Sequence, residues 1–243
     1  MIQSLQDWWS LAGVDRDYSD LPSALLATEA AAPAPVAEAA LAVTERAPEP
    51  AEPEQRAEIL PRAHADFVAW LAGSPDLAEA DWSRQRVLPE GVLEPEVMVV
   101  SAMPEKTGHG AAALFSPPHR ALLDRMLAAI GCDSQNSYLA TIAVAPSITG
   151  RIDDHLWMPL KTRLLHHVGL VRPKRIICFG DTMAKILFGE DLLSARKNKL
   201  FVNHGSSTTE AIVTFHPRTL LERPLFKAEA WKDLQMLTRI DAP

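Results

Sequence analysis

Apolar residues follow two different spacings along this chain, and the alternation between them predicts its elements. Four short runs of mainly apolar residues are typical of strands buried on both faces: Glu96–Ser101, Tyr138–Val144, Arg175–Phe179 and Ala211–Phe215. Between these runs, apolar residues recur every three or four positions, which predicts amphipathic helices. We expect the helices over 62–73, Pro117–Ile130, Asp154–Val168, Asp181–Leu187 and Pro224–Ile240, with a short helix or turn over 76–88.

The alternation of strands and helices predicts the α/β fold class. Four apolar strands separated by helices imply a four-stranded parallel sheet covered on both faces, a three-layer α/β/α architecture. Ligands of such sheets bind at the carboxyl ends of the strands. No G-x-G-x-x-G or Walker lysine motif follows any of the strands, so nothing supports a nucleotide cofactor. The rule selects four segments for a site: Ser101–Gly108, Val144–Ile148, Gly180–Thr182 and His216–Arg218.

The first 60 residues have a different character. Residues 1–27 are expected to form a helix and turn, in which Trp8 and Trp9 dock onto the rest of the protein or onto a protein partner. Residues 28–60 are rich in Ala, Pro and Glu and lack aromatic residues, which predicts a linker that is disordered or partly helical. The globular domain is expected over 61–243.

Charge is unevenly distributed between these regions. The chain of 243 residues has a formal charge of -7. Residues 1–60 hold 11 acids against 3 bases, whereas residues 151–243 hold 15 bases against 10 acids. Because binding depends on where charge lies, the overall acidity does not argue against a nucleic-acid surface late in the chain.

Cysteine usage and hydropathy bear on the compartment. Cys132 and Cys178 are the two cysteines, and this scarcity fits a reducing cytosol. No apolar run approaches the roughly 20 residues of a membrane helix, and the start lacks a basic region typical of signal peptides. We therefore expect a cytoplasmic protein without a membrane association.

Three motifs in a fixed order carry a resemblance to a known family. They are Leu114–Pro117 with the LLDRMLAAIG run that follows, Leu170–Asp181, and Phe215–Pro224 with the following Lys227–Gln235. Together they resemble the uracil-DNA glycosylase superfamily over about residues 94–240, nearest the bacterial iron–sulfur branch called family 4. The resemblance implies hydrolysis of an N-glycosidic bond in DNA base-excision repair, by a monomer that flips the base out of the DNA.

The resemblance assigns roles to residues of the candidate site. His216, directly after the fourth strand, would donate a hydrogen bond toward O2 of uracil, and Phe115 would stack on the base. Thr141 stands where the family has the asparagine that reads uracil. A single hydroxyl in place of an amide weakens discrimination between bases. A packing role for Phe115 is the alternative.

The first family motif departs from the family pattern here. Ala102 stands where the family has an acid that handles water, and alanine cannot act as a base. Pro104 fits the motif, and Met103 lies beside it. Glu105, three residues after Ala102, is a candidate for part of the missing role with a different geometry. His216 and Glu105 are thus the candidate catalytic residues.

Basic residues and a leucine pair predict a DNA-contacting surface. Arg218 stands where the family has serine and could hold a phosphate. Leu220 and Leu221 fall in the loop that enters the duplex in the family, although one of them is expected to pack in the core. The cluster of Arg196, Lys197 and Lys199 is a third candidate for contacts to DNA phosphates. A solvated loop is the alternative interpretation of this cluster.

An iron–sulfur cluster is not expected. The strand-end cysteine of the family corresponds to Ala145, and both cysteines of this chain are interpreted as packing residues. The other histidines, at 109, 119, 155, 166 and 167, lack metal-ligand spacing and are interpreted as core or surface residues.

Two functions follow from these observations. One is a DNA glycosylase with altered or weak activity. The other is a catalytically inactive DNA-binding or scaffold protein that keeps the fold. A more remote third alternative is hydrolysis of another N-glycosidic or small ester substrate by Glu105.

Overall fold

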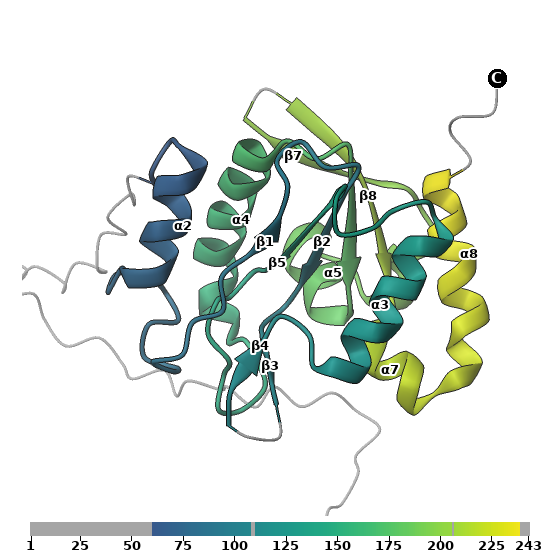
Figure 1. Cartoon of the computed structure of the whole chain (residues 1–243), viewed down its shortest axis with the longest axis horizontal. Coiled ribbons are helices and arrows are strands. Elements are labelled where there is room, and N and C mark those ends of the chain that lie inside the picture. The colour runs from purple at the N-terminus through teal and green to yellow at the C-terminus, as the bar shows by residue number, and fades with distance from the viewer. Residues whose placement is uncertain (1–59, 108–109, 206, 239–243) are drawn as a thin grey trace, which may run out of the picture. The chain divides into compact units, whose positions relative to one another are not determined.

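A six-stranded sheet forms the centre of the part of the chain that the computed structural model describes, residues 60–107, 110–205 and 207–238 (Figure 1). The predicted segments 1–27 and 28–59 lie outside the described residues. The strand order is β1-β5-β2-β6-β8-β7. The bounds are β1 Glu90–Gly91, β2 Val97–Ser101, β5 Ser137–Thr141, β6 Arg175–Phe179, β7 Leu200–His204 and β8 Ser207–Thr214.

The four predicted parallel strands are confirmed, but the predicted sheet was too small. β5, β2, β6 and β8 run parallel, with Ser101 opposite Thr141 at one end of the pair β2–β5. β1 and β7 add antiparallel edges next to β5 and β8. β1 has only two residues, and β7 alternates between exposed and buried positions. Neither forms the continuous apolar run by which a buried strand is recognised.

Helices cover both faces of the sheet in three layers. α4 (Trp157–Val171) and α5 (Asp181–Phe188) pack on one face, where Leu160, Leu164 and Met183 meet apolar residues of the strands. α3 (Pro117–Ala129) and α8 (Lys227–Thr238) pack on the other face (Figure 1). α2 (His64–Gly73) lies beside α4 (Figure 1). The three-layer α/β/α architecture predicted from the sequence is therefore confirmed.

Several short elements were not predicted. A hairpin of β3 (Glu105–Lys106) and β4 (Ala112–Ala113) follows β2, and α6 (Leu192–Ala195) and α7 (Pro217–Glu222) follow β6 and β8. Residues 76–88 form turns and no helix. Short 3-10 turns at Asp154–Leu156 and Pro224–Phe226 precede α4 and α8. No helix of the described ranges is both long and apolar enough to cross a membrane.

A buried ion pair fastens the segment 76–88 to the sheet. Glu79 is fully buried and forms a two-pronged pair with Arg163 of α4. The same carboxylate accepts a hydrogen bond from the backbone of Val144 at 2.8 Å, and Arg163 donates to the carbonyl of Ile142 at 2.8 Å. The pair thus fixes the chain just beyond β5, where the segment Pro146–Gly150 begins.

Removal of Arg163 will test how much this pair contributes to stability. In Arg163→Met, the carboxylate of Glu79 remains buried without its partner, and the free energy of unfolding is expected to fall by about 3–5 kcal/mol. Urea denaturation measures the change. The matched control is Arg172→Met, which removes an exposed pair with Glu94 and should cost less than about 1 kcal/mol. Equal losses in both variants would contradict the expectation.

Candidate active site at the carboxyl ends of the strands

A cleft of about 470 Å³ opens at the carboxyl ends of the parallel strands. All four segments selected from the sequence contribute to its wall, because parallel strands end at the same edge of the sheet. The lining residues are Ala102–Lys106, Pro146–Gly150, Phe179–Thr182, His216, Arg218 and Thr219.

Glu105 is held at the amino end of α3 by the hairpin β3–β4. Its side chain is 4% exposed. The oxygen Oε2 accepts a hydrogen bond from the backbone N–H of Ser116 at 2.7 Å and contacts Nδ1 of His119 at 2.5 Å. The first turn of a helix favours a carboxylate because its N–H groups are unpaired and its dipole is positive there.

The other carboxylate oxygen of Glu105 has no hydrogen bond. Oε1 is buried, and it lies 3.7 Å from Nε2 of His216 and 3.4 Å from the guanidinium of Arg218. A buried acceptor without a partner is uncommon in proteins and costs free energy. Glu105 therefore presents an unused acceptor to the side of the cleft where His216 and Arg218 lie.

Opposing effects act on the pKa of Glu105. Burial raises the pKa of this carboxyl, but the hydrogen bonds from Ser116 and His119 and the nearby charge of His216 lower it more. The net effect is a pKa below the usual value for glutamate. Glu105 is thus a carboxylate at neutral pH.

His216 is held in one orientation by the turn that starts α7. It is the N-cap of that helix, and its Nδ1 accepts a hydrogen bond from the backbone N–H of Arg218 at 3.2 Å. Because Nδ1 must offer a lone pair, the neutral ring carries its proton on Nε2, which faces Glu105. The ring stacks on Phe115 with centroids 5.6 Å apart and meets the edge of Phe179 at 5.8 Å.

Burial keeps the imidazole of His216 neutral. Desolvation lowers the pKa of His216 to about 4, although the carboxylate of Glu105 raises it and Arg218 and His119 lower it further. The site therefore combines an ionised carboxylate with a neutral N–H donor at neutral pH. Such a pair can accept a proton or stabilise a cation at one atom and donate a hydrogen bond at the other.

His119 contacts Glu105 at this site, although the sequence analysis interprets it as a core or surface residue. Its Nδ1 contacts both Ser116 Oγ, at 2.7 Å, and Glu105. Since serine and glutamate meet the same ring nitrogen, the three groups do not form the relay that activates a serine nucleophile. The position of His119, three residues after the helix N-cap Ser116, places it over the carboxylate and could have drawn attention to it.

The residues predicted for the base pocket fall into two groups. Ala102, Met103 and Pro104 line the cleft. Phe115 is 5% exposed, does not line the cleft, and has one face of its ring against His216. Thr141 is 6% exposed, lies outside the cleft wall, and its hydroxyl has no hydrogen bond. The structure thus brings three of the five predicted residues to the cleft.

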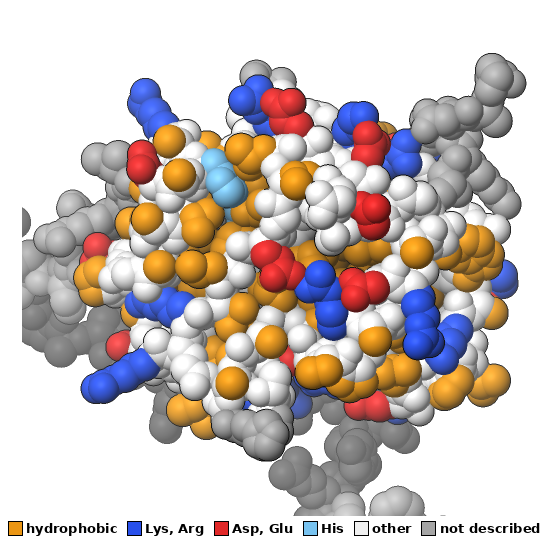
Figure 2. Space-filling model, in the orientation of Figure 1, with side chains coloured by type: hydrophobic (Ala, Val, Ile, Leu, Met, Phe, Trp, Pro, Cys, Tyr) orange, Lys and Arg blue, Asp and Glu red, His pale blue; other side chains and the backbone are white. Residues whose placement is uncertain are grey.

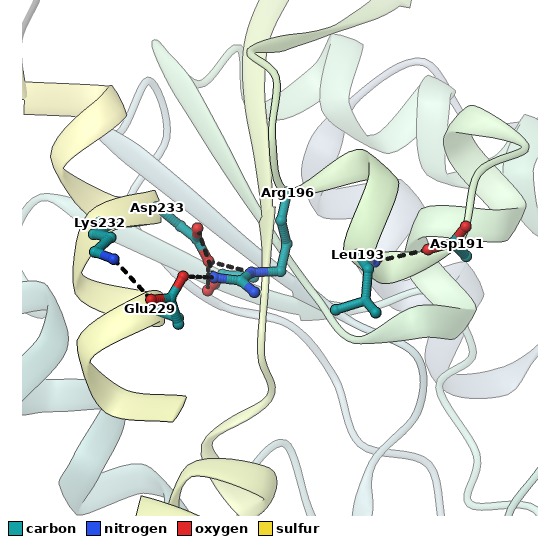
Figure 3. Close-up of polar contacts among 7 residues, drawn as sticks. Asp191, Leu193, Arg196, Glu229, Lys232 and Asp233 are labelled. Atoms are coloured by element: carbon teal, nitrogen blue, oxygen red, sulfur yellow. Dashed lines mark hydrogen bonds and ion pairs between the residues drawn. The ribbon is translucent and has the colours of Figure 1, made fainter. Parts of the chain in front are cut away.

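Two predicted DNA contacts are occupied elsewhere. Leu220 is 1% exposed and packs with Phe215 and Ala230, so its side chain is in the core and not at a DNA surface. Arg196 is bound to Asp233 of α8 at 2.7 and 3.0 Å and lies 3.6 Å from Glu229 (Figure 3). The partners of Arg196 were not evident from the sequence pattern, whereas the burial of Leu220 agrees with the expectation that one of the two leucines packs in the core.

Arg196 fixes the segment that leads to His216. Its guanidinium lies 4.1 Å from the centre of the ring of Phe215, and the hydroxyl of Thr214 donates to the same Asp233 carboxylate at 2.6 Å. Thr214 and Phe215 are the last two residues before His216. The ion pair in Figure 3 therefore holds in place the residues that lead to His216.

The remaining predicted cations differ in their surroundings. Arg218 is half exposed at the cleft. Lys197 is exposed, and Lys199 forms an ion pair with Glu210 at 2.8 Å. On the face shown in Figure 2, basic side chains are scattered among acidic ones and do not gather in one field. Arg218 is thus the predicted cation that the structure places at the cleft.

The cysteines do not suit an iron–sulfur cluster. Such a cluster takes four thiolate ligands, and the chain has two cysteines. Burial raises the pKa of Cys178, inside β6, to about 12 and also raises the pKa of Cys132, so both favour the thiol. In the described residues no group of three or more His, Cys, Asp or Glu could hold a metal ion.

Comparison with known proteins agrees with the fold. The model of the uracil DNA glycosylase superfamily matches residues 88–235, and the chain belongs to this superfamily. It is similar to the type-4 uracil-DNA glycosylase of Pyrobaculum aerophilum. The two sequences are 25% identical over 166 residues, which cover 63% of this chain and 82% of the relative.

Titration of His216 will test the electrostatics of the site. NMR of the labelled imidazole should give a midpoint near pH 4, because the ring is desolvated. In Glu105→Gln the midpoint should move to lower pH, because the carboxylate that favours the charged ring is gone. Glu96→Gln, which alters an exposed pair with Lys174, serves as the control and should leave the midpoint in place. An upward shift in Glu105→Gln would refute this account.

Proposed function

We propose that this protein hydrolyses the N-glycosidic bond of a base in DNA, with Glu105 in place of the acid that Ala102 cannot supply. The observation that carries this proposal is that Oε1 of Glu105 has no hydrogen bond and lies buried beside Nε2 of His216 and the guanidinium of Arg218, at a cleft at the carboxyl ends of the strands. Membership of the uracil-DNA glycosylase superfamily supports the reaction class.

Glu105 and His216 divide the chemistry between them in this proposal. A water on Oε1 of Glu105 attacks C1′ of the sugar as the bond from C1′ to the base nitrogen breaks. The bonding pair leaves with the base, and Glu105 takes a proton from the water. The N–H of His216 donates a hydrogen bond to the base oxygen on which negative charge develops. This division needs an ionised Glu105 and a neutral His216, which are the states favoured at neutral pH.

Arg218 has a role in binding DNA in this proposal. The exposed guanidinium of Arg218 would contact a phosphate at the mouth of the cleft, where its charge also faces Glu105.

No step of this chemistry requires an iron–sulfur cluster, and we propose that the protein acts without one. A partner for the Trp8–Trp9 segment remains a prediction, since that segment lies outside the described residues.

A catalytically inactive DNA-binding protein is the second candidate. It is favoured by two specific observations: the ring of Phe115 is covered by His216, and Thr141 does not reach the cleft. These are the positions from which the family resemblance expects stacking and base reading. Loss of both contacts would weaken selection of a base while leaving phosphate contacts in place.

A glycosylase assay with two site variants will decide between the candidates. Oligonucleotides that carry uracil, hypoxanthine or xanthine, single-stranded and duplex, are incubated with the protein and cleaved at abasic sites. Glu105→Gln and His216→Ala are each expected to lower the rate by about 100-fold, because each removes one side of the donor–acceptor pair. Glu96→Gln, an exposed glutamate outside the cleft, should leave the rate unchanged.

The assay also has outcomes against the proposal. Cleavage that survives in both site variants would place the chemistry elsewhere. No cleavage by the wild type, together with DNA binding that weakens steeply with salt, would establish the inactive DNA-binding protein. Absence of both cleavage and binding would exclude both candidates.

The pH dependence of the rate gives an independent prediction. Activity requires a carboxylate at Glu105 and a neutral ring at His216, so it falls as either group gains a proton. Because the pKa of His216 is about 4 and that of Glu105 is below its usual value, the acid limb should lie near pH 4. Initial rates on uracil-containing DNA, with the fold checked by circular dichroism at each pH, measure it. An acid limb near pH 6.5, typical of an ordinary histidine, would contradict the assignment.

A further inference from the structure

Ile148 is a large apolar side chain exposed at the lip of the cleft. Its exposed fraction is 82%, although the residues just before it, Pro146 and Ser147, are buried. It lies in the wall segment Pro146–Gly150, between β5 and α4. Single exposed apolar residues are common on protein surfaces, so the position of Ile148 needs support from its surroundings.

The turn that presents Ile148 is held by side-chain hydrogen bonds. The hydroxyl of Ser147, a buried residue, bonds with the hydroxyl of Thr149 at 2.9 Å and accepts from the backbone N–H of Thr149 at 3.2 Å. The hydroxyl of Thr149 accepts in turn from the backbone of Arg151 at 3.3 Å. These bonds close a turn around Ile148, so its side chain is presented from a defined backbone.

The base of the same segment is anchored in the core. The backbone N–H of Val144 is bound by the buried Glu79 at 2.8 Å, and its carbonyl accepts from Val87 at 2.8 Å. Ile148 lies four positions after this fixed point. The lip of the cleft is therefore attached to the most deeply buried ion pair described in the domain, and not to a free loop.

The position where the family resemblance expects a duplex-entering leucine is only partly available here. Leu220 is 1% exposed and packs among Phe215 and Ala230, so it cannot leave the core without opening it. Leu221 is 39% exposed, less than half the exposed fraction of Ile148. Proteins that bend DNA frequently insert an apolar side chain between base steps and partly unstack them.

Three cations lie in the cleft wall or close to Ile148 in the sequence. Arg151 is exposed three residues after Ile148, and Lys106 and Arg218 line the cleft. Phosphates on either side of a flipped nucleotide need such contacts to fix the duplex. An exposed apolar side chain and cations in the same region suit the base stack and the phosphate backbone of DNA.

We infer that Ile148 enters the base stack of duplex DNA beside the flipped nucleotide, from the segment between β5 and α4. The inference rests on the proposed function, because it requires the protein to bind DNA and extrude a base. It assigns the wedge to a different segment from the one that follows β8.

Base extrusion can be measured separately from cleavage if the uridine carries a 2′-fluorine, which slows loss of the base. A duplex with 2-aminopurine next to uracil fluoresces more when the neighbouring base leaves the stack. The wild-type protein should raise the fluorescence on binding, and Ile148→Ser should lower this rise about tenfold, because a serine fills the gap poorly. Ile148→Leu should retain most of the rise. Affinity for single-stranded DNA should change by less than about twofold, since no stack is opened there.

Two further variants control for exposure and for position. Phe201→Ser removes a side chain that is 62% exposed on the edge strand β7, outside the cleft wall, and should leave the fluorescence rise intact. Leu221→Ser should have the smaller effect of the two candidate wedges. All variants alter exposed positions, so their thermal midpoints should match that of the wild type.

The outcomes separate the inference from the proposed function. If the wild type binds and opens duplex DNA and Ile148→Ser does so equally well, the inference is wrong and the proposed function stands. A loss confined to Leu221→Ser would place the wedge on α7 and would also overturn the inference. If the wild type binds no DNA at any salt concentration, the proposed function fails and the inference falls with it.

Discussion

The cleft depends on the hydrogen bonds to the buried carboxylate of Glu105. A charge removed from water is stable only when hydrogen bonds replace its hydration. Ser116 and His119 supply these bonds to one oxygen and in doing so join the hairpin β3–β4 to the amino end of α3. The second oxygen is left without a bond where the strand ends meet. The same contact that makes burial tolerable thus also leaves an acceptor without a hydrogen bond beside His216.

Burial opposes the charged form of both groups of the pair, but other interactions outweigh it only for Glu105. For Glu105, desolvation opposes the charged form but is outweighed by donors on the helix. For His216, desolvation also opposes the charged form, and the single carboxylate does not overcome it. The result is one charged and one neutral group a few ångströms apart. Proteins use such divergent environments to give neighbouring residues different tasks.

The sequence allowed the parallel core of the fold to be predicted because each of its strands is a continuous apolar run. The strand Arg175–Phe179 was placed to the residue, and β2 differed by one position. The edge strand β7 could not be found in this way, since its exposed Phe201 and Asn203 interrupt the run. The hairpin β3–β4 is too short to carry a periodicity at all. The parallel strands can therefore be predicted from the hydrophobic pattern, whereas the edge strands cannot.

The candidate site was predictable where its residues directly follow strands. Ala102, Met103, Glu105, His216 and Arg218 were placed at the cleft by the rule for strand ends. His119 was missed because it reaches the site from the first turn of α3 and not from the end of a strand, where the rule for parallel sheets places a site. Arg196 and Leu220 were assigned to DNA from their type and neighbourhood, but their partners Asp233 and Ala230 come from α8. Pairing across elements is the information that a single sequence does not contain.

The site also depends on a helix outside the cleft wall, because Arg196 and its partner Asp233 support Phe215. None of the described residues of α8 lines the cleft, yet its Asp233 holds both Thr214 and the guanidinium that covers Phe215. A chain shortened before α8 would keep every residue of the cleft wall and lose the brace behind His216. The boundary of the smallest working domain is therefore set by this ion pair, well beyond Thr219, the last residue of the cleft wall.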